Sequence, residues 1–174
     1  MILVSLFAAV MCIFAPFTVP FGPVPLSLST FALYLTAIIL GKKAVISIIV
    51  YIVIGVVGLP VFSGGVGGLD RLLGPTGGFI LGYIPCTVIS GIFADKFTNK
   101  FSGKFIGLFI GTITMYIPGI LWMLYILGAD SVSSAVSVIG VNILPFVPID
   151  IIKMFLATFV GCKVKERIFN EKIY

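Results

Sequence analysis

The sequence predicts an all-α integral membrane protein: one domain over residues 1–174, with six transmembrane helices and Gly/Pro-rich outer loops. The first observation is composition, because 60% of the residues are hydrophobic, 10% are charged and the mean hydropathy is +1.27. A soluble domain is about 45–50% apolar and about 25% charged. The second observation is that no charged residue precedes Lys42. A membrane span needs about 20 residues, so this stretch is long enough for two spans.

Each predicted helix is an apolar run bounded by a charged turn or by glycines and prolines. The six runs are Ile2–Ala15, Leu28–Leu40, Ala44–Gly58, Gly77–Ala94, Phe105–Leu127 and Pro148–Lys163. Three irregular stretches separate some of them: Pro16–Pro25, Leu59–Thr76, and Gly128–Leu144 with a short helix near Ser131–Ile139. Thr76 is expected to be an N-cap. The first run has no basic segment before it and no A-x-A-like cleavage site, which predicts a membrane helix rather than a signal peptide.

The distribution of basic residues predicts the orientation in the membrane. Only Arg71 falls on one side, whereas the other side holds Lys42, Lys43, Lys96, Lys100, Lys104, Lys163, Lys165, Arg167 and Lys172. The positive-inside rule places that second side in the cytoplasm. We therefore expect a multi-pass protein of the plasma membrane with both termini cytoplasmic and all three irregular stretches facing outward.

Asp150 and Lys153 are the only ionisable residues expected inside the membrane. They stand three residues apart on a predicted helix, so they share a face. An unpaired charge at mid-bilayer costs about 2.5–3.5 kcal/mol on insertion scales, so lipid exposure is not expected. One interpretation is a structural ion pair. The other is the polar floor of a site for a ligand with an anionic group and hydrogen-bond donors, and both roles can hold together.

Several functional classes lack the residues that they need. The chain has no histidine, and Cys12, Cys86 and Cys162 are far apart, so neither a metal site nor a disulfide framework is indicated. The basic residues are scattered at helix ends, which argues against nucleic-acid binding. A lone Asp–Lys pair is no usual acid–base set, so no enzyme activity and no cofactor are expected.

Small residues recur at four-residue spacing on two predicted helices. The first helix carries the pairs Ser5 with Ala9 and Ala8 with Cys12, and the fourth carries Gly78 with Gly82. Such rows let helices approach closely in lipid. For the first helix, packing within the chain and docking onto another membrane subunit are equally consistent with the pattern.

The glycine-rich stretch at Gly64, Gly65, Gly67 and Gly68 matches no nucleotide-binding pattern, because no G-x-x-x-x-G-K-[ST] is present. It is either a flexible outer loop or a lid whose backbone approaches a ligand closely. Tyr34 and Tyr83 lie on helices that adjoin outer loops, which makes them candidate pocket residues.

Four motifs in order resemble the BioY family, the biotin-specific S components of energy-coupling factor (ECF) transporters. They are the segments Val24–Ala32, Gly58–Gly65, Gly74–Phe79 and Pro145–Lys153. Ser29 and Ile149 depart from the glutamine and glycine that many members carry. The resemblance implies a six-helix S-component fold that binds biotin with high affinity from outside. It also implies a transmembrane coupling subunit and two cytoplasmic ATPases as partners.

The resemblance also implies a set of site residues. The helix that contains Asp150 and Lys153 contributes polar ligand contacts in this family. The full candidate substrate-binding set is Asp150, Lys153, Thr30, Tyr34, Phe62, Gly64, Gly65, Gly67, Gly68, Thr76, Gly77 and Tyr83, and the candidate docking set is Ser5, Ala8, Ala9 and Cys12. The alternative function is an autonomous secondary transporter of a small vitamin-like carboxylate, with Asp150 as its proton site.

Overall fold

The computed structural model describes residues 1–19, 26–98, 100–129 and 131–169. Its helices are α1 (Ile2–Phe14), α2 (Ser29–Leu40), the 3-10 helix η1 (Gly41–Lys43), α3 (Ala44–Val56), α4 (Leu69–Leu73), α5 (Gly77–Lys96), α6 (Phe101–Ile126), α7 (Val132–Asn142) and α8 (Phe146–Phe169). Strands β1 (Thr18–Val19) and β2 (Leu26–Ser27) pair antiparallel. Residues 20–25 of the predicted break Pro16–Pro25 fall outside the described residues, as does the basic residue Lys172.

The predicted helices are present, with shifts at their ends. The predicted start of the fifth helix was wrong, because α6 begins at Phe101 rather than Phe105 and so includes Lys104. Lys104 is only 1% exposed there, and its ammonium lies 3.7 Å from the sulfur of Cys162 on α8. Because Lys104 packs against α8, the segment from Phe101 to Lys104 is helical, although its charge predicts a turn. Thr76 occupies the N-cap position of α5, but its side chain makes no capping hydrogen bond.

Length and hydropathy do not give six separate spans in the part of the chain that the structure describes. Three helical stretches are long and apolar enough to cross a membrane: Ser29–Val56, which joins α2, η1 and α3, then Gly77–Lys96 and Phe101–Ile126. A fourth span results if the pair Val132–Val141 and Phe146–Arg167, bent by 42°, counts as one. The count of six spans stays a prediction, whereas the all-helical membrane class is clear from these apolar helices.

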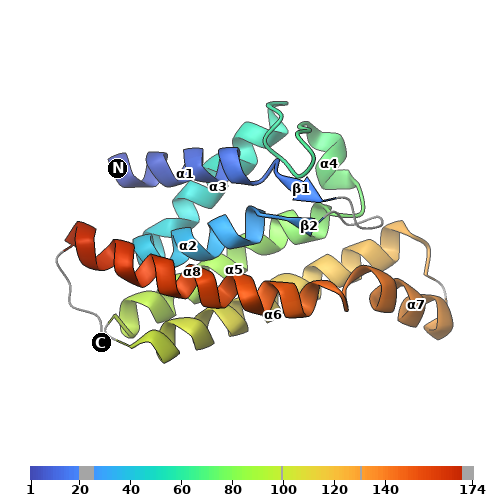
Figure 1. Ribbon diagram of the computed structural model, residues 1–174. Coiled ribbons are helices and arrows are strands. Elements are labelled where there is room, and N and C mark those ends of the chain that lie inside the picture. The colour runs from blue at the N-terminus through green and yellow to red at the C-terminus, as the bar shows by residue number, and fades with distance from the viewer. Residues whose placement is uncertain (20–25, 99, 130, 170–174) are drawn as a thin grey trace.

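Helices α2, α3 and α6 pack against α5 (Figure 1). Helix α6 lies along α5, α8 packs against α2 and α6, and α1 packs against α3 and α2. Glycines allow the close approach of α5 and α6, since a Cβ at Gly82 would stand 2.8 Å from the carbonyl oxygen of Met115. A Cβ at Gly78 would stand 2.6 Å from that of Pro118. The small-residue spacing predicted for this helix is thus used for packing within the chain.

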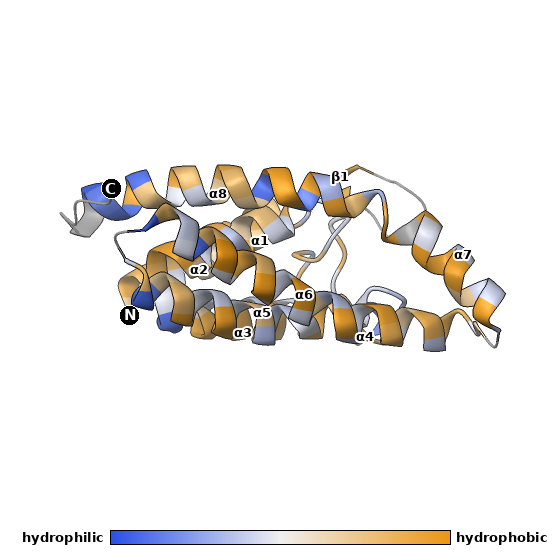
Figure 2. Ribbon diagram, turned by 90° about the horizontal axis from the view of Figure 1, so that it is seen from below, coloured by the Kyte–Doolittle hydropathy of each residue, from blue (hydrophilic) through white to orange (hydrophobic). Residues whose placement is uncertain are grey.

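The two ends of the molecule differ in character. Helix α1 begins and helix α8 ends on the same side of the molecule, which we call the basic end. Hydrophilic positions of the ribbon gather there (Figure 2). The β1–β2 hairpin, α4 and α7 gather at the opposite end (Figure 1). The irregular connections therefore lie together, away from most of the lysines.

Candidate functional site

A cavity lies at the end of the molecule that carries the irregular connections. Its walls come from β2 and the start of α2, the segment before and within α4, the facing parts of α5, α6 and α8, and Ile143 in the turn after α7. It is lined by Ser27, Ser29, Thr30, Ser63, Arg71, Thr76, Phe79, Ile80, Tyr83, Met115, Tyr116, Ile143, Phe146, Asp150 and Lys153. The lining thus combines aromatic and aliphatic side chains with a few polar groups, as small-molecule sites do.

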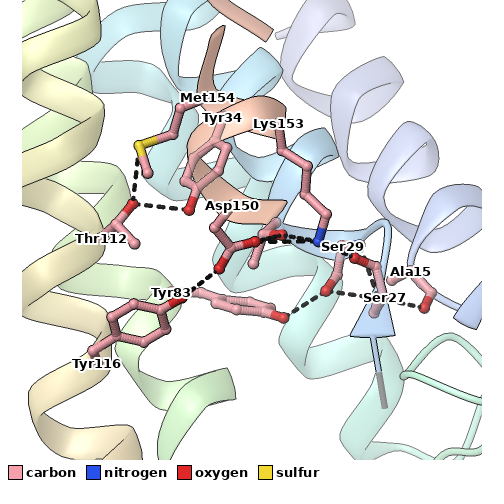
Figure 3. A network of polar contacts seen from close by, with 11 residues as sticks. Ala15, Ser27, Ser29, Tyr34, Tyr83, Thr112, Tyr116, Asp150, Lys153 and Met154 are labelled. Atoms are coloured by element: carbon pink, nitrogen blue, oxygen red, sulfur yellow. Dashed lines mark hydrogen bonds and ion pairs between the residues drawn. The ribbon is translucent and has the colours of Figure 1, made fainter. Parts of the chain in front are cut away.

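The floor of the cavity is the ion pair between Asp150 and Lys153 on α8. Both side chains are buried, and the ammonium of Lys153 lies 3.2 Å from Oδ1 of Asp150. Figure 3 shows both side chains directed from α8 toward the start of α2. Lys153 also donates to the carbonyl oxygen of Ser27 at 2.7 Å and to the hydroxyl of Thr30 at 3.0 Å. The predicted pair therefore exists, and it ties α8 to the segment that begins α2.

Only one partner of the ion pair has an unused hydrogen-bonding site. An ammonium has three N–H donors, and the three acceptors around Lys153 use all of them. Oδ1 of Asp150 accepts from Lys153 and, at 3.1 Å, from Thr30, while Oδ2 accepts from the hydroxyl of Tyr116 at 2.6 Å. A carboxylate has about four lone-pair sites. Asp150 can therefore accept a further hydrogen bond at Oδ2, whereas Lys153 has no N–H left to donate.

A second polar group stands beside the ion pair. The hydroxyls of Ser29 and Tyr83 lie 2.7 Å apart, and the backbone N–H of Ser29 donates to the hydroxyl of Ser27 at 2.8 Å. Ser27 in turn donates to the carbonyl oxygen of Ala15 at 3.1 Å (Figure 3). These bonds fix the turn from β2 into α2 and present the Ser29–Tyr83 pair to the cavity.

Arg71 supplies a positive charge from α4, outside the ion pair. Its Nη2 donates to the carbonyl oxygen of Ser63 at 2.9 Å. Its Nε is buried and has no hydrogen-bond partner among the described residues. A guanidinium has five N–H donors in a planar fork that suits a carboxylate. The cavity therefore has an unused donor on α4 as well as the unused acceptor site on α8.

Five residues of the predicted substrate-binding set line the cavity: Thr30, Thr76, Tyr83, Asp150 and Lys153. The other members do not line it. Tyr34 is fully buried and hydrogen-bonds at 2.8 Å with Thr112 (Figure 3).

Phe62 and the glycines act on the backbone around the cavity. Phe62 is fully buried, and its ring packs edge-on against Tyr51 with centroids 5.6 Å apart, so it anchors the loop in the core. Gly64, Gly65 and Gly68 have positive φ angles of 85°, 68° and 102°, a conformation that favours glycine. A Cβ at Gly67 or at Gly77 would collide with neighbouring backbone. These glycines shape the loop and the start of α5.

The sequence analysis missed several lining residues, chiefly Ser29, Arg71, Phe79 and Tyr116. Two of them carried a usable signal. Arg71 is the single basic residue on the expected outer side, and Tyr116 is a tyrosine within an apolar run that needs a hydrogen-bond partner. Phe79 has no signal of its own, because an apolar residue on a membrane helix faces lipid, core or cavity without any change in the local pattern.

The predicted docking residues on α1 do not share one environment. Ser5 and Ala9 are exposed, Cys12 is half-buried, and Ala8 is only 2% exposed. The pair Ser5 and Ala9 therefore lies on the free face of α1, and Ala8 packs inside the chain. Within the described residues, no group of three or more His, Cys, Asp or Glu side chains could hold a metal ion.

Fold and cavity together define a class: a helical membrane protein with a small cavity built around a buried ion pair. The chain matches the model of the BioY family over residues 1–170. The biotin transporter BioY of Thermotoga maritima is 31% identical over 167 residues, which cover 93% of each chain. The biotin transporter BioY2 of Lactococcus lactis subsp. cremoris is 34% identical over 173 residues, covering 99% of this chain and 93% of that protein. The chain therefore belongs to the BioY family.

A solved structure has the same fold. The chain is similar to the S-component for biotin from an ECF-type ABC transporter, with a TM-score of 0.81, 26% sequence identity, and coverage of 94% of this chain and 88% of that one. The S-component fold expected from the four motifs is confirmed. The relatives are named as transporters and the matched fold is that of a transporter component, which places the chain in a transporter family and not among enzymes.

Proposed function

We propose that the protein is the high-affinity biotin-binding membrane subunit of an ATP-driven ECF vitamin importer. It captures biotin from outside and docks on a coupling subunit. The observation that carries the proposal is the unused acceptor site on Asp150 and the unused donor on Arg71, which line one cavity in a BioY family chain. Relatives that are named biotin transporters support the choice of ligand.

The hydrogen-bond inventory of the cavity suggests how biotin is held. Biotin carries N–H donors on its ureido ring and a carboxylate on its side chain. Asp150 accepts from a ureido N–H at Oδ2, where capacity remains. Arg71 pairs with the carboxylate, because its Nε has no partner among the described residues. Lys153 is a positioning residue that holds the Asp150 carboxylate in place.

The segment Leu59–Thr76 acts as a lid on this site. Phe62 anchors its first part in the core, while Ser63 and Arg71 line the cavity and hydrogen-bond to each other at 2.9 Å. The cavity volume is about 70 Å³, and small-molecule sites measure about 300–1,000 Å³. Biotin therefore enters when the lid and the side chains beneath it move outward, which the glycines with positive φ allow.

The energy for release comes from partners. The sequence contains no nucleotide-binding motif, so ATP hydrolysis is assigned to two cytoplasmic ATPases joined to a transmembrane coupling subunit. The exposed small residues Ser5 and Ala9 on α1 form the docking face for that subunit. We infer that both termini lie in the cytoplasm, because the positive-inside rule favours that side for the lysine-rich basic end.

Ligand binding is tested on the detergent-purified protein, without nucleotide or added ion, by thermal unfolding and isothermal titration calorimetry. Biotin at 100 times its dissociation constant is expected to raise the free energy of unfolding by about 2.7 kcal/mol. Thiamine and riboflavin serve as control ligands. Stabilisation by either of these, with none by biotin, would overturn the proposal. Uptake of biotin into liposomes by this chain alone, driven by a pH gradient, would support the autonomous transporter instead.

The orientation of the ligand is tested with biotinamide, which lacks the anionic carboxylate. The native protein is expected to bind biotin more tightly than biotinamide, and Arg71→Met is expected to abolish that preference. The matched variant Lys153→Met is expected to keep it. A preference that survives in Arg71→Met and disappears in Lys153→Met would show that Lys153 meets the carboxylate.

A further inference from the structure

We propose that a second cavity, at the basic end of the molecule, binds the phosphate of an anionic phospholipid headgroup. This cavity has a volume of about 580 Å³ and shares no lining residue with the biotin cavity. Its polar lining is Lys42, Lys43, Asp95 and Lys165. Its apolar lining comes from Met1, Ile2, Leu3, Val4, Ile39 and Leu40. Nothing in the biotin-binding role uses these side chains.

Lys165 on α8 is the residue that points to an anion. It is 6% exposed, yet it has no hydrogen bond or ion pair with any described residue. Only Arg71 Nε is both fully buried and without a partner among the described residues, so the Lys165 ammonium is reached from the cavity that the residue lines. A phosphate oxygen in the cavity would accept the hydrogen bonds that the protein does not supply, which is a charge-assisted and therefore strong contact.

The other charged groups of the cavity leave a positive balance. Lys42 and Lys43 on η1 are exposed and line the same space as Lys165. The one carboxylate, Asp95, accepts from the backbone N–H of Lys42 at 3.0 Å. Among the described residues, Asp95 forms no ion pair with any of the three lysines. Asp95 therefore holds η1 against α5, and the three ammonium groups together attract an anion.

The apolar wall identifies the anion as part of a lipid. The first turn of α1 lines the cavity, and its Ile2 is 86% exposed. An acyl chain can lie against this wall while its phosphate sits among the lysines. Basic pockets between transmembrane helices on the cytoplasmic side bind anionic headgroups. The positive-inside rule places this end in that leaflet.

The test titrates the detergent-purified full chain with dioleoylphosphatidylglycerol and follows thermal unfolding and native mass spectra. Dioleoylphosphatidylcholine and inorganic phosphate, each at the same concentration, are the other arms. Of these three compounds, only phosphatidylglycerol is expected to stay bound in the mass spectra and to stabilise the native protein. Each lysine removed should weaken its binding about fivefold, so Lys42→Gln with Lys43→Gln should lose about 25-fold. Lys165→Met should weaken phosphatidylglycerol binding at least as much as Lys42→Gln or Lys43→Gln alone.

The control is the double variant Lys96→Gln with Lys100→Gln, which removes the same charge from exposed positions near the basic end that do not line the cavity. It should bind phosphatidylglycerol as the native protein does, and every variant should still be stabilised by biotin, which reports correct folding. Equal losses in the two double variants would show diffuse surface attraction and overturn the proposal. Equal stabilisation by phosphatidylcholine or by inorganic phosphate would overturn the assignment to an anionic lipid.

Discussion

The buried ion pair on α8 permits a double-mutant cycle that separates its structural role from its ligand role. In Lys153→Met the Asp150 carboxylate, which is 5% exposed, keeps only the donors Thr30 and Tyr116. Removing one partner of a buried pair typically costs about 3–5 kcal/mol of stability. Asp150→Asn should lie at the lower end of that range, because the Lys153 ammonium keeps two neutral acceptors. The double variant should regain most of the stability, since it leaves no unpaired charge.

Ligand affinity should not follow the same pattern. A hydrogen bond to a charged group contributes about 1.5–3 kcal/mol, or about tenfold to 150-fold in affinity. Asp150→Asn replaces the charged acceptor for the ureido ring with a neutral amide oxygen, which weakens that contact. The double variant combines this weakened contact with the loss of the positioning of the side chain, so we expect it to fold but to bind biotin at least about a hundredfold more weakly.

The assay measures unfolding and biotin affinity on the same purified variants, with calorimetric titration for the affinity. Lys163→Met is the matched control, because this lysine is exposed on the same helix and its removal changes the net charge equally. It should alter the free energy of unfolding by less than about 1 kcal/mol. A stable double variant that binds biotin as tightly as the native protein would refute the ligand role and leave a structural ion pair.

Three further predictions follow from exposure and hydrogen bonding. Ala9→Trp should weaken association with a co-expressed coupling subunit and spare biotin binding. Ala8→Trp should overpack α1 and lower the free energy of unfolding by about 1–3 kcal/mol. Unchanged co-purification of Ala9→Trp with the coupling subunit would exclude the exposed face of α1 as the docking face. A spin label at Ser63 should report slower motion when biotin is bound, and identical spectra with and without biotin would argue against a lid. Tyr116→Phe removes a hydrogen bond of 2.6 Å to a carboxylate and should weaken biotin binding, while the exposed Tyr125→Phe should not; equal affinities in both variants would contradict the role of Tyr116.

Ranges of helices were predictable wherever a local signal marks both ends. Glycines and prolines break the apolar runs at Pro16 and Leu59, and the observed helices stop near those positions. The start of α6 was not predictable, because the charge of Lys104 indicates a turn. Only the folded structure shows that Lys104 is buried against α8. The α4 turn and the β1–β2 pair are too short for any periodic pattern.

The sequence alone determined the membrane class, the excess of lysines on one side, the family, and the charged pair on the last helix. Each of these depends on composition or on residues close together in the chain, which packing cannot change. Only the tertiary structure decided which side chains line the cavity, because Ser29, Arg71 and Tyr116 come from separate elements whose distances depend on how the helices pack. Tertiary packing also separated Ala8 from Ala9 and buried Tyr34 and Phe62 outside the cavity. It also showed that Lys153 uses all its N–H donors, whereas Asp150 has an unused acceptor site and Arg71 an unused donor. Which hydrogen bonds a side chain makes depends on the groups that the fold places around it, and not on the residue type alone.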